Sequence, residues 1–339
     1  MKQVTYRGPE RITVDEWISP ELPANYVAVK VAYVGVCGTD LHLYAGHMDS
    51  RVTTPHVPGH EMSGVVARTG AGVSEWKIGE KVTVRPLLPC KNCRTCNEGN
   101  SHICPKLKFI GVDLGGAMQP EWIVPAELLH RIPEQITLRQ GALIEPLAVA
   151  IHDVRMADLD PTDVITIVGA GPIGLLIGIV CVSRGHKTFI TDIDQTRLDV
   201  AKSHGMIPVA PDKVEAAARE ATNGLGTDVV FEVSGSAGGA TLISTIVKPR
   251  GKIIVVGIHA ELRQFNLQQI FHKEVTMQGA RVYKSIDFDD AIAFLATRTK
   301  ELEPLITKVF PVEDALEAYL SLTRGGSIKN LIAISEPAI

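Results

Sequence analysis

Several features that would assign a chain to a special class are missing from this sequence of 339 residues. It has no run of like charges, no low-complexity tract and no internal repeat. The net charge is −4, so no basic field attracts nucleic acid or anionic lipid. The longest apolar run, residues 173–183, contains glycine and is too short to span a bilayer. The first residues lack the apolar core of a signal peptide, so we expect a cytoplasmic protein without nucleic-acid or membrane partners.

The composition and length are those of an ordinary globular protein with two domains. Apolar residues make up 45% and charged residues 21% of the chain. Short β-rich runs, such as 26–33, 63–68 and 81–85, recur in the first 145 residues between glycine and proline. This part predicts a partly closed β barrel or sandwich with long loops.

The pattern changes near residue 163 to apolar strands that alternate with helices. Strands are predicted at 164–168, 206–209, 228–233 and 252–258, and helices at 197–204, 213–222 and 238–247. Continuous apolar strands of this kind indicate a parallel sheet covered on both faces, hence a doubly wound α/β domain. After residue 279, helices at 287–296 and 312–323 and a strand at 328–334 predict a tail that returns to the first domain. The predicted domains are 1–148, 149–279 and 280–339.

A glycine-rich turn after the first of these strands predicts a dinucleotide site. Gly169, Gly171 and Gly174 form G-x-G-x-x-G, with Pro172 and Ile173 between the last two, before an apolar helix. The glycines permit a tight turn and a close approach to a pyrophosphate, which the helix N-terminus attracts.

An acidic residue stands where a nucleotide ribose is expected. Asp192 ends the next strand, where a carboxylate binds both ribose hydroxyls and repels a 2′-phosphate, so NAD is favoured over NADP. Asp194 competes for this role. Arg197 either stacks on the adenine or is solvated.

Four of the six cysteines form a closely spaced group that predicts a structural zinc site. Cys90, Cys93, Cys96 and Cys104 make C-x2-C-x2-C-x7-C in a lobe at about residues 88–106. Four thiolates close a tetrahedron around one zinc and leave no open position. Free cysteines and an iron–sulfur cluster are the alternatives.

A second set of potential metal ligands is dispersed along the chain. Cys37, His60, Glu61 and Glu145 stand in the segments VGVCGTDLH, VPGHEMSG and ALIEPLAVA. Each alone has an ordinary explanation: a buried thiol, a hydrogen-bonded histidine or a helix-capping carboxylate. Glycines beside the first two segments permit close backbone approach, so a second metal site is an open alternative.

Together these segments resemble the medium-chain zinc-dependent dehydrogenases, in order and in spacing, over nearly the whole chain. The resemblance rests on Cys37-Gly38-Thr39-Asp40, Gly59-His60-Glu61, the four-cysteine lobe, Glu145-Pro146 and the GAGPIG turn. It implies a GroES-like catalytic domain, a Rossmann domain and a returning C-terminal tail.

The resemblance also implies roles for individual residues. Cys37 and His60 would be ligands of the catalytic zinc, with Glu61 as the third ligand in the manner of sorbitol dehydrogenases. Glu145 would bind this zinc, exchange with Glu61 or hold the zinc-bound water. Thr39 would take the proton of the substrate hydroxyl and His42 would pass it to solvent. Asp40 is expected to be structural or to orient a ligand.

The substrate is expected to be a polyol or a sugar acid that gives a hydride to NAD. Arg281 lies where sorbitol-type enzymes place an arginine near the substrate, and Tyr44 is a further candidate beside the pocket. Ala117 replaces an aromatic residue of the family, and Met118 and Trp122 alter the same wall, so no particular polyol is implied.

The alternatives are an L-threonine 3-dehydrogenase, a 2,3-butanediol dehydrogenase, or a redox sensor that binds zinc and NAD without turnover. We expect a homodimer or homotetramer built through the Rossmann domain, with residues 252–258 and the segment after them as the edge.

Overall fold

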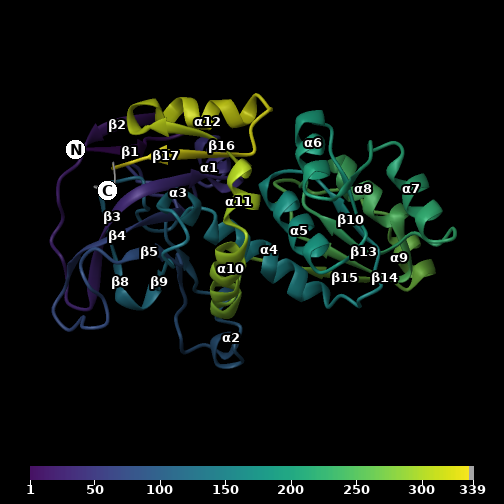
Figure 1. The fold of residues 1–339 in the computed structure, drawn as a ribbon, viewed down its shortest axis with the longest axis horizontal. Helices are drawn as coiled ribbons and strands as arrows, with labels where there is room; N and C mark the ends of the chain where they lie inside the picture. The colour runs from purple at the N-terminus through teal and green to yellow at the C-terminus, as the bar shows by residue number, and fades with distance from the viewer. Residues whose placement is uncertain (336–339) are drawn as a thin grey trace. The chain divides into compact units, whose positions relative to one another are not determined.

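The computed structural model describes residues 1–335 and divides the chain into two compact units (Figure 1). Residues 1–145 and the chain from Lys284 onward form the first unit, and Pro146–Tyr283 forms the second. The predicted boundaries were after residues 148 and 279. The division near residue 145 falls inside helix α4 (Ile144–Ala157), so one continuous helix belongs to both units.

The first unit is built around one mixed sheet of mostly antiparallel strands. Its strands run in the order β16-β17-β3-β4-β5-β9, and β8 also pairs with β3. The bounds are β3 Tyr26–Val36, β4 Glu61–Thr69, β5 Lys81–Val84, β8 Glu121–Pro125, β9 Leu129–Arg131, β16 Ile306–Pro311 and β17 Lys329–Ala333. Two small hairpins accompany it: β1 Lys2–Tyr6 with β2 Ile12–Glu16, and β6 Leu87–Leu88 with β7 Lys108–Phe109. Alternating valines of β3 supply much of the buried core.

The C-terminal segment adds strands to this sheet. β17 pairs antiparallel with β3 and parallel with β16, so residues 329–333 lie beside a strand from the first part of the chain. The α-helices of the unit are α1 Gly38–Tyr44, α2 Arg94–Asn97, α3 Leu138–Gly141, α10 Ser285–Thr297, α11 Thr299–Leu302 and α12 Ala315–Thr323. Single 3-10 turns lie at Ser101–Ile103, Ala126–Leu128, Glu303–Leu305 and Val312–Asp314.

The second unit contains a parallel sheet in the order β12-β11-β10-β13-β14-β15. Its strands are β10 Ile165–Val168, β11 Thr188–Thr191, β12 Ile207–Pro208, β13 Thr227–Glu232, β14 Val247–Val255 and β15 Thr276–Gly279. Helices α5 Pro172–Ser183, α6 Gln195–Ser203, α7 Val214–Ala221, α8 Ala237–Ile246 and α9 Leu267–Lys273 surround it (Figure 1). The strand order reverses between β10 and β13, which is where open sheets of this kind bind ligands.

Several sequence-based assignments differ from the structure. The predicted strand at 252–258 is interior, because β14 pairs with β13 on one side and β15 on the other. The edge is β15, which lies in the segment after residue 258 that was predicted as part of the edge, and it is a short strand of exposed residues without a strand-like apolar pattern. Helix α1 was not predicted, because seven residues with a mixed burial pattern give little periodic signal.

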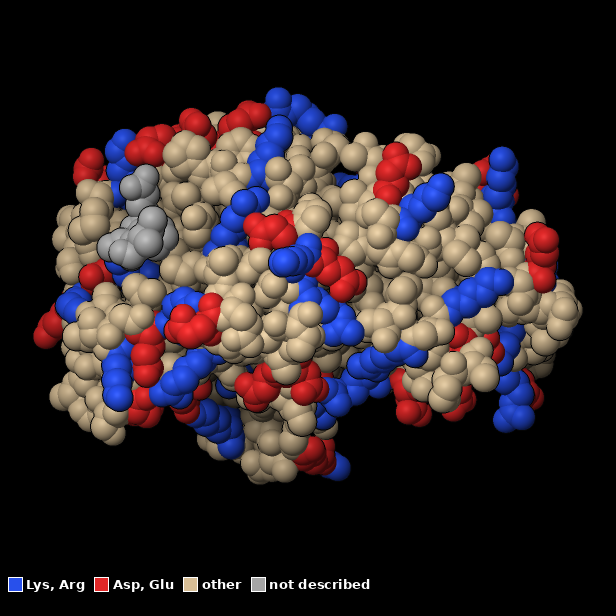
Figure 2. Space-filling view, in the orientation of Figure 1, with Lys and Arg blue, Asp and Glu red and all other residues tan. Residues whose placement is uncertain are grey.

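The surface and the helices agree with the charge and length arguments from the sequence. Basic and acidic side chains are interspersed on the face shown in Figure 2, without a large patch of one sign. Within residues 1–335, every helix is too short or too polar to pass through a bilayer.

Candidate active site and metal centres

The cysteine of the dispersed set lies at the junction of β3 and α1. Cys37 follows β3 directly and is the N-cap residue of α1. The Thr39 backbone N–H donates to the Cys37 Sγ over 3.2 Å, and the Cys37 backbone N–H donates to the Asp40 Oδ2 over 2.9 Å. This reciprocal cap holds the thiol at the end of a buried strand, with one hydrogen bond to its sulfur and one to its backbone N–H.

Strand pairing brings His60 and Glu61 to the same place. Glu61 is the first residue of β4 and lies opposite Gly35 of β3 in the antiparallel register. The Cys37 Sγ and the His60 Nε2 are 3.1 Å apart. Ligand atoms of Cys37, His60 and Glu61 all lie within 4.8 Å of one another. A thiolate, an imidazole and a carboxylate are a donor set that zinc accepts in catalytic sites, so these residues fit the metal.

The other ring nitrogen of His60 faces a buried carboxylate. The His60 Nδ1 is 4.0 Å from the Asp40 Oδ1, and both side chains are almost completely buried. This nitrogen has no hydrogen-bond partner among residues 1–335. Burial alone would lower the pKa of His60, but the Cys37 and Asp40 charges raise it well above its ordinary value. The arrangement is that of a metal-binding histidine with a carboxylate behind it.

A buried lysine that no sequence motif singles out holds Glu61. The Lys329 Nζ on β17 donates to the Glu61 Oε1 over 2.8 Å and to the Glu61 Oε2 over 2.5 Å. It also donates to the Val36 carbonyl over 3.2 Å. Burial would lower the pKa of Lys329, but Glu61 and then Cys37 raise it above its ordinary value. The ammonium therefore stays charged and compensates the Glu61 carboxylate, which is itself one of the candidate metal ligands.

Glu145 is buried in the first turn of α4, outside the group just described. Its negative charge contributes to the raised pKa values of His60 and Lys329, after burial and the charges of nearer groups. Glu145 is therefore close enough to act on the group electrostatically. Its role as a zinc ligand stays a prediction.

Two histidines lie on the exposed side of α1 and after it. The Nδ1 atoms of His42 and His47 are 3.2 Å apart. Burial and the neighbouring His47 lower the pKa of His42 from its ordinary 6.5. Thr39, one turn before His42, is partly exposed. The sequence singled out Thr39 and His42, and the structure adds His47 as the partner of His42.

The four cysteines of the lobe converge on one point. The Sγ–Sγ distances are 3.5 Å for Cys93–Cys96 and Cys90–Cys104, 3.8 Å for Cys93–Cys104 and 4.0 Å for Cys90–Cys96. A tetrahedron with zinc–sulfur bonds of about 2.3 Å has edges of about 3.8 Å. All are free thiols, and their separations exceed a disulfide bond. The lobe fits a four-thiolate zinc.

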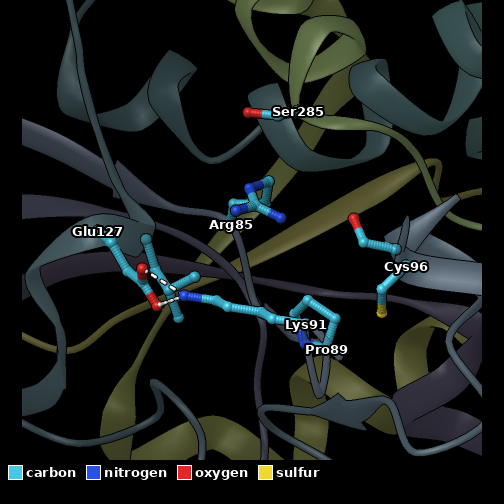
Figure 3. A pocket seen from close by; sticks show the side chains of 8 residues that line it. Arg85, Pro89, Lys91, Cys96, Glu127 and Ser285 are labelled. Atoms are coloured by element: carbon cyan, nitrogen blue, oxygen red, sulfur yellow. Dashed lines mark hydrogen bonds and ion pairs between the residues drawn. The ribbon is translucent and has the colours of Figure 1, made fainter. Parts of the chain in front are cut away.

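A pocket of about 240 Å³ borders this lobe (Figure 3). Arg85, Lys91, Cys96 and Ser285 contribute to its wall, and Lys91 is paired with Glu127 over 2.6 Å. None of the dispersed metal-ligand candidates lines it. The pocket therefore belongs to the surroundings of the cysteine lobe rather than to the catalytic group.

The glycine-rich turn of the second unit has the close contacts that require glycine. Gly169 has φ +109°, and a Cβ there would lie 2.9 Å from the Ser234 backbone nitrogen. A Cβ on Gly174 would lie against the Gly169 carbonyl. Gly171 is the N-cap of α5 with open space beside it, and Pro172 begins the helix. The turn leaves the helix N-terminus accessible to a phosphate group.

Asp192 follows β11 and anchors this turn. Its Oδ2 accepts a hydrogen bond from the Ala170 backbone N–H over 2.6 Å, and its Oδ1 accepts one from the Asp194 N–H over 2.9 Å. Each oxygen retains a lone pair for a ribose hydroxyl. Asp194 caps α6 and lies 3.6 Å from the guanidinium of Arg197. The sequence left Asp194 as a competitor for the ribose. In the structure, the Asp194 carboxylate instead caps α6 and pairs with Arg197.

The candidate substrate residues are less well defined. Tyr44 is partly buried, with its ring 6.0 Å from that of Tyr319. Arg281 is exposed in the second unit, and its role stays a prediction. Ala117, Met118 and Trp122 are buried in the core of the first unit. Their part in a pocket wall stays a prediction.

Two family models match the chain. The alcohol dehydrogenase GroES-like domain matches residues 23–134, and the zinc-binding dehydrogenase domain matches residues 172–297. Together the two matches cover more than half of the sequence. The first contains both groups of clustered metal-ligand candidates, and the second begins at the helix that follows the glycine-rich turn.

Curated relatives match over nearly their whole length. The chain is 42% identical over 319 residues to a 2-dehydro-3-deoxy-L-galactonate 5-dehydrogenase from Pseudoalteromonas atlantica, with 94% of each chain covered. It is 32% identical to a sorbitol dehydrogenase from Halalkalibacterium halodurans, with 97% of each covered.

Solved structures match at lower identity. A 2R,3R-butanediol dehydrogenase from Bacillus subtilis has a TM-score of 0.90 at 28% identity, covering 98% of this chain and 99% of that one. An alcohol dehydrogenase from Escherichia coli complexed with NADH has a TM-score of 0.88 at 28% identity, with coverage of 98% and 99%. A zinc-binding dehydrogenase from Sinorhizobium meliloti bound to NADP has a TM-score of 0.92 at 27% identity, with 98% of both chains covered.

Proposed function

This chain belongs to the zinc-dependent alcohol dehydrogenase family, as a polyol or sugar-acid dehydrogenase, and we propose that it transfers a hydride from a secondary hydroxyl group to NAD. The observation that carries the proposal is the convergence of Cys37, His60 and Glu61 within 4.8 Å. We assign the metal chemistry to the first unit and the dinucleotide to the second, with 1–148, 149–279 and 280–339 as the functional segments.

The residues around the first unit's metal group divide the chemistry among them. Zinc, when bound by Cys37, His60 and Glu61 or Glu145, supplies a Lewis acid that lowers the pKa of the substrate hydroxyl. Thr39 takes the proton of that hydroxyl through its own side chain. His42 accepts it next and, through the 3.2 Å contact, shares it with His47 at the surface. The lowered pKa of His42 supports this role, because a neutral imidazole is needed to accept a proton.

The cofactor proposal rests on the turn from Gly169 to Gly174 and on Asp192. The N-terminal N–H groups of α5, beside Pro172 and Ile173, would hold the pyrophosphate. Asp192 would accept hydrogen bonds from the ribose hydroxyls, and a 2′-phosphate there would face a carboxylate. Arg197 lies 3.6 Å from the Asp194 carboxylate, which reduces its attraction for a 2′-phosphate. NAD is the proposed acceptor, although one structural neighbour is bound to NADP.

We propose a sugar acid as the substrate class, because the 42% identical relative is named as a dehydrogenase of one. A cationic side chain would then meet the substrate carboxylate, and Arg281 is our candidate for it, with Tyr44 as a candidate contact for the hydroxyl groups. A small vicinal diol is the second candidate substrate, favoured by the 0.90 TM-score to the butanediol dehydrogenase.

We further propose that the chain forms a homodimer or homotetramer in the cytoplasm. The edge strand β15 presents unpaired backbone groups, and Met277 on it and Leu267 and Phe271 on α9 are exposed. A second copy that paired with this edge would cover these side chains. The free thiols of the cysteine lobe suit a reducing compartment.

The test is NADH formation by zinc-loaded protein with NAD and a panel of hexonates, keto-deoxy sugar acids, hexitols, pentitols, L-threonine and 2,3-butanediol. Turnover concentrated on the acids is the expected result. A Cys37→Ser variant should lose turnover and keep its affinity for NADH, because Cys37 lies in the first unit and the dinucleotide turn in the second. Turnover on hexitols alone would overturn the substrate class, and full activity of the variant would overturn the catalytic site.

A further inference from the structure

A second polar cluster lies at the carboxyl ends of β13 and β14, apart from the residues assigned so far. Glu232 is the last residue of β13, and its side chain is fully buried. The loop after it contacts the glycine-rich turn, because a Cβ on Gly169 would lie 2.9 Å from the Ser234 nitrogen. The strand order reverses between β10 and β13. The cluster therefore borders the crevice where a doubly wound sheet binds a dinucleotide.

The Glu232 carboxylate is saturated on one oxygen by its own loop. Its Oε1 accepts hydrogen bonds from the Ser234 N–H over 3.1 Å, the Ser234 hydroxyl over 2.5 Å and the Gly235 N–H over 3.1 Å. Three donors converging on one oxygen indicate an ionised carboxylate. The loop and the carboxylate thus form one rigid unit.

The other oxygen holds a histidine from the next loop. The Glu232 Oε2 is 2.9 Å from the Nε2 of His259, which lies after β14. Because the carboxylate can only accept, the Nε2 carries the ring proton. The His259 Nδ1 is then a lone-pair acceptor in the neutral ring. It is buried and has no hydrogen-bond partner within residues 1–335, although the side chain as a whole is 20% exposed.

An acceptor that is fixed and unpartnered beside a ligand crevice requires a donor on the ligand. The pyrophosphate can only accept hydrogen bonds, so it does not match this nitrogen. Asp192 at the end of β11 serves the adenosine half of the dinucleotide, and β13 and β14 lie on the opposite side of β10. The half of the dinucleotide beyond the pyrophosphate offers the hydroxyl donors of its second ribose.

We propose that the His259 Nδ1 accepts a hydrogen bond from a hydroxyl of the nicotinamide ribose, and that Glu232 is the positioning residue that fixes the ring for it. This inference rests on the proposed use of NAD. It gives the chain a polar contact at each end of the cofactor: a carboxylate at one ribose and an imidazole at the other.

The test measures the dissociation constants of NADH, ADP-ribose and ADP by fluorescence and calorimetry on zinc-loaded protein. ADP-ribose keeps the second ribose but lacks nicotinamide, and ADP lacks both. His259→Gln places its polar group near the position of the Nε2, and His259→Asn places it near that of the Nδ1. We expect His259→Gln to raise the dissociation constants of NADH and ADP-ribose about 3- to 10-fold, as for the loss of one hydrogen bond. The dissociation constant of ADP should not change. His259→Asn should retain most of the affinity.

Each of the other outcomes would overturn a particular part of this proposal. Unchanged affinities in both variants, or an equal loss for all three ligands, would overturn the hydrogen bond to the second ribose. A loss for NADH alone would assign the contact to the nicotinamide amide and overturn the ribose. If the unaltered protein failed to bind NADH at all, the proposed use of NAD would fail first.

Discussion

Replacing Lys329 by methionine should destabilise the first unit more than any single surface change. The side chains of Lys329 and Glu61 are 1% and 3% exposed, and both carboxylate oxygens depend on this ammonium. Removing one partner of a buried ion pair leaves an uncompensated buried charge, which costs about 3–5 kcal/mol. With a denaturant dependence near 3 kcal/mol per molar urea, the midpoint would fall by about 1–2 M.

Tryptophan fluorescence is a suitable probe for this prediction. The chain has three tryptophans, Trp17, Trp76 and Trp122, and all lie in the first unit. Urea unfolding followed at their emission therefore reports on the unit that contains the pair. Lys308→Met on the neighbouring β16 is the matched control, because Lys308 is exposed and its loss should change stability by about 0.5 kcal/mol or less.

A double variant separates the pair from simple loss of packing. Glu61→Gln alone leaves the Lys329 ammonium buried without its charge partner, so it should also destabilise. Combining Glu61→Gln with Lys329→Met removes both charges, and the double variant should be more stable than the sum of the single losses predicts by about 2–3 kcal/mol. If Lys329→Met stayed within about 1 kcal/mol of the parent protein, or if the losses simply added, the reasoning would be refuted.

Three further predictions concern the other sites. Cys93→Ser should lower thermal stability and reduce bound zinc from two ions to one per chain by elemental analysis, whereas a stable variant with both ions would contradict a structural lobe. Asp192→Ala should weaken NADH binding and reduce the preference for NADH over NADPH in binding titrations. An unchanged ratio of the two dissociation constants would remove Asp192 from the ribose site. Alcohol oxidation should lose rate as the pH falls below 6.5, because protonated His42 cannot accept the proton, and the His42→Gln variant should lose this limb of the pH–rate profile; a limb that persisted would assign it to another group.

Local patterns were sufficient for the parts of the site that are contiguous in sequence. The spacing of the four cysteines predicted that they form one group, because a single loop holds all four. In the structure, the sulfurs of the contacting pairs lie 3.5–4.0 Å apart. The turn from Gly169 to Gly174 was recognisable because only glycine fits against Ser234 and the Gly169 carbonyl. In both cases the chemistry and the chain geometry impose the same short motif.

Contacts between distant segments could not be read from the sequence. Lys329 stands 268 residues from Glu61, in a strand whose apolar pattern indicated only a β-strand. His47 lies after a helix too short to give a periodic signal. β15 was missed because its residues, TMQG, are all exposed and lack alternation. β15 forms a strand because it pairs with β14, and this pairing depends on the tertiary fold rather than on the local sequence.

Both polar clusters of this protein contain buried charge, which explains why Lys329 and Glu232 escaped prediction. A charged residue within an apolar segment is ordinarily assigned to the surface, because burying it without a partner is costly. Here Glu61 and Glu232 lie at strand ends, almost completely buried, and each is compensated from another strand or loop: Lys329 for the first, and Ser234 and His259 for the second. Glu61 is itself a candidate metal ligand, and Glu232 holds the histidine that we propose as a contact of the dinucleotide. Because each carboxylate is compensated by its partners and lies beside a proposed ligand site, substitution of either should change ligand binding as well as stability.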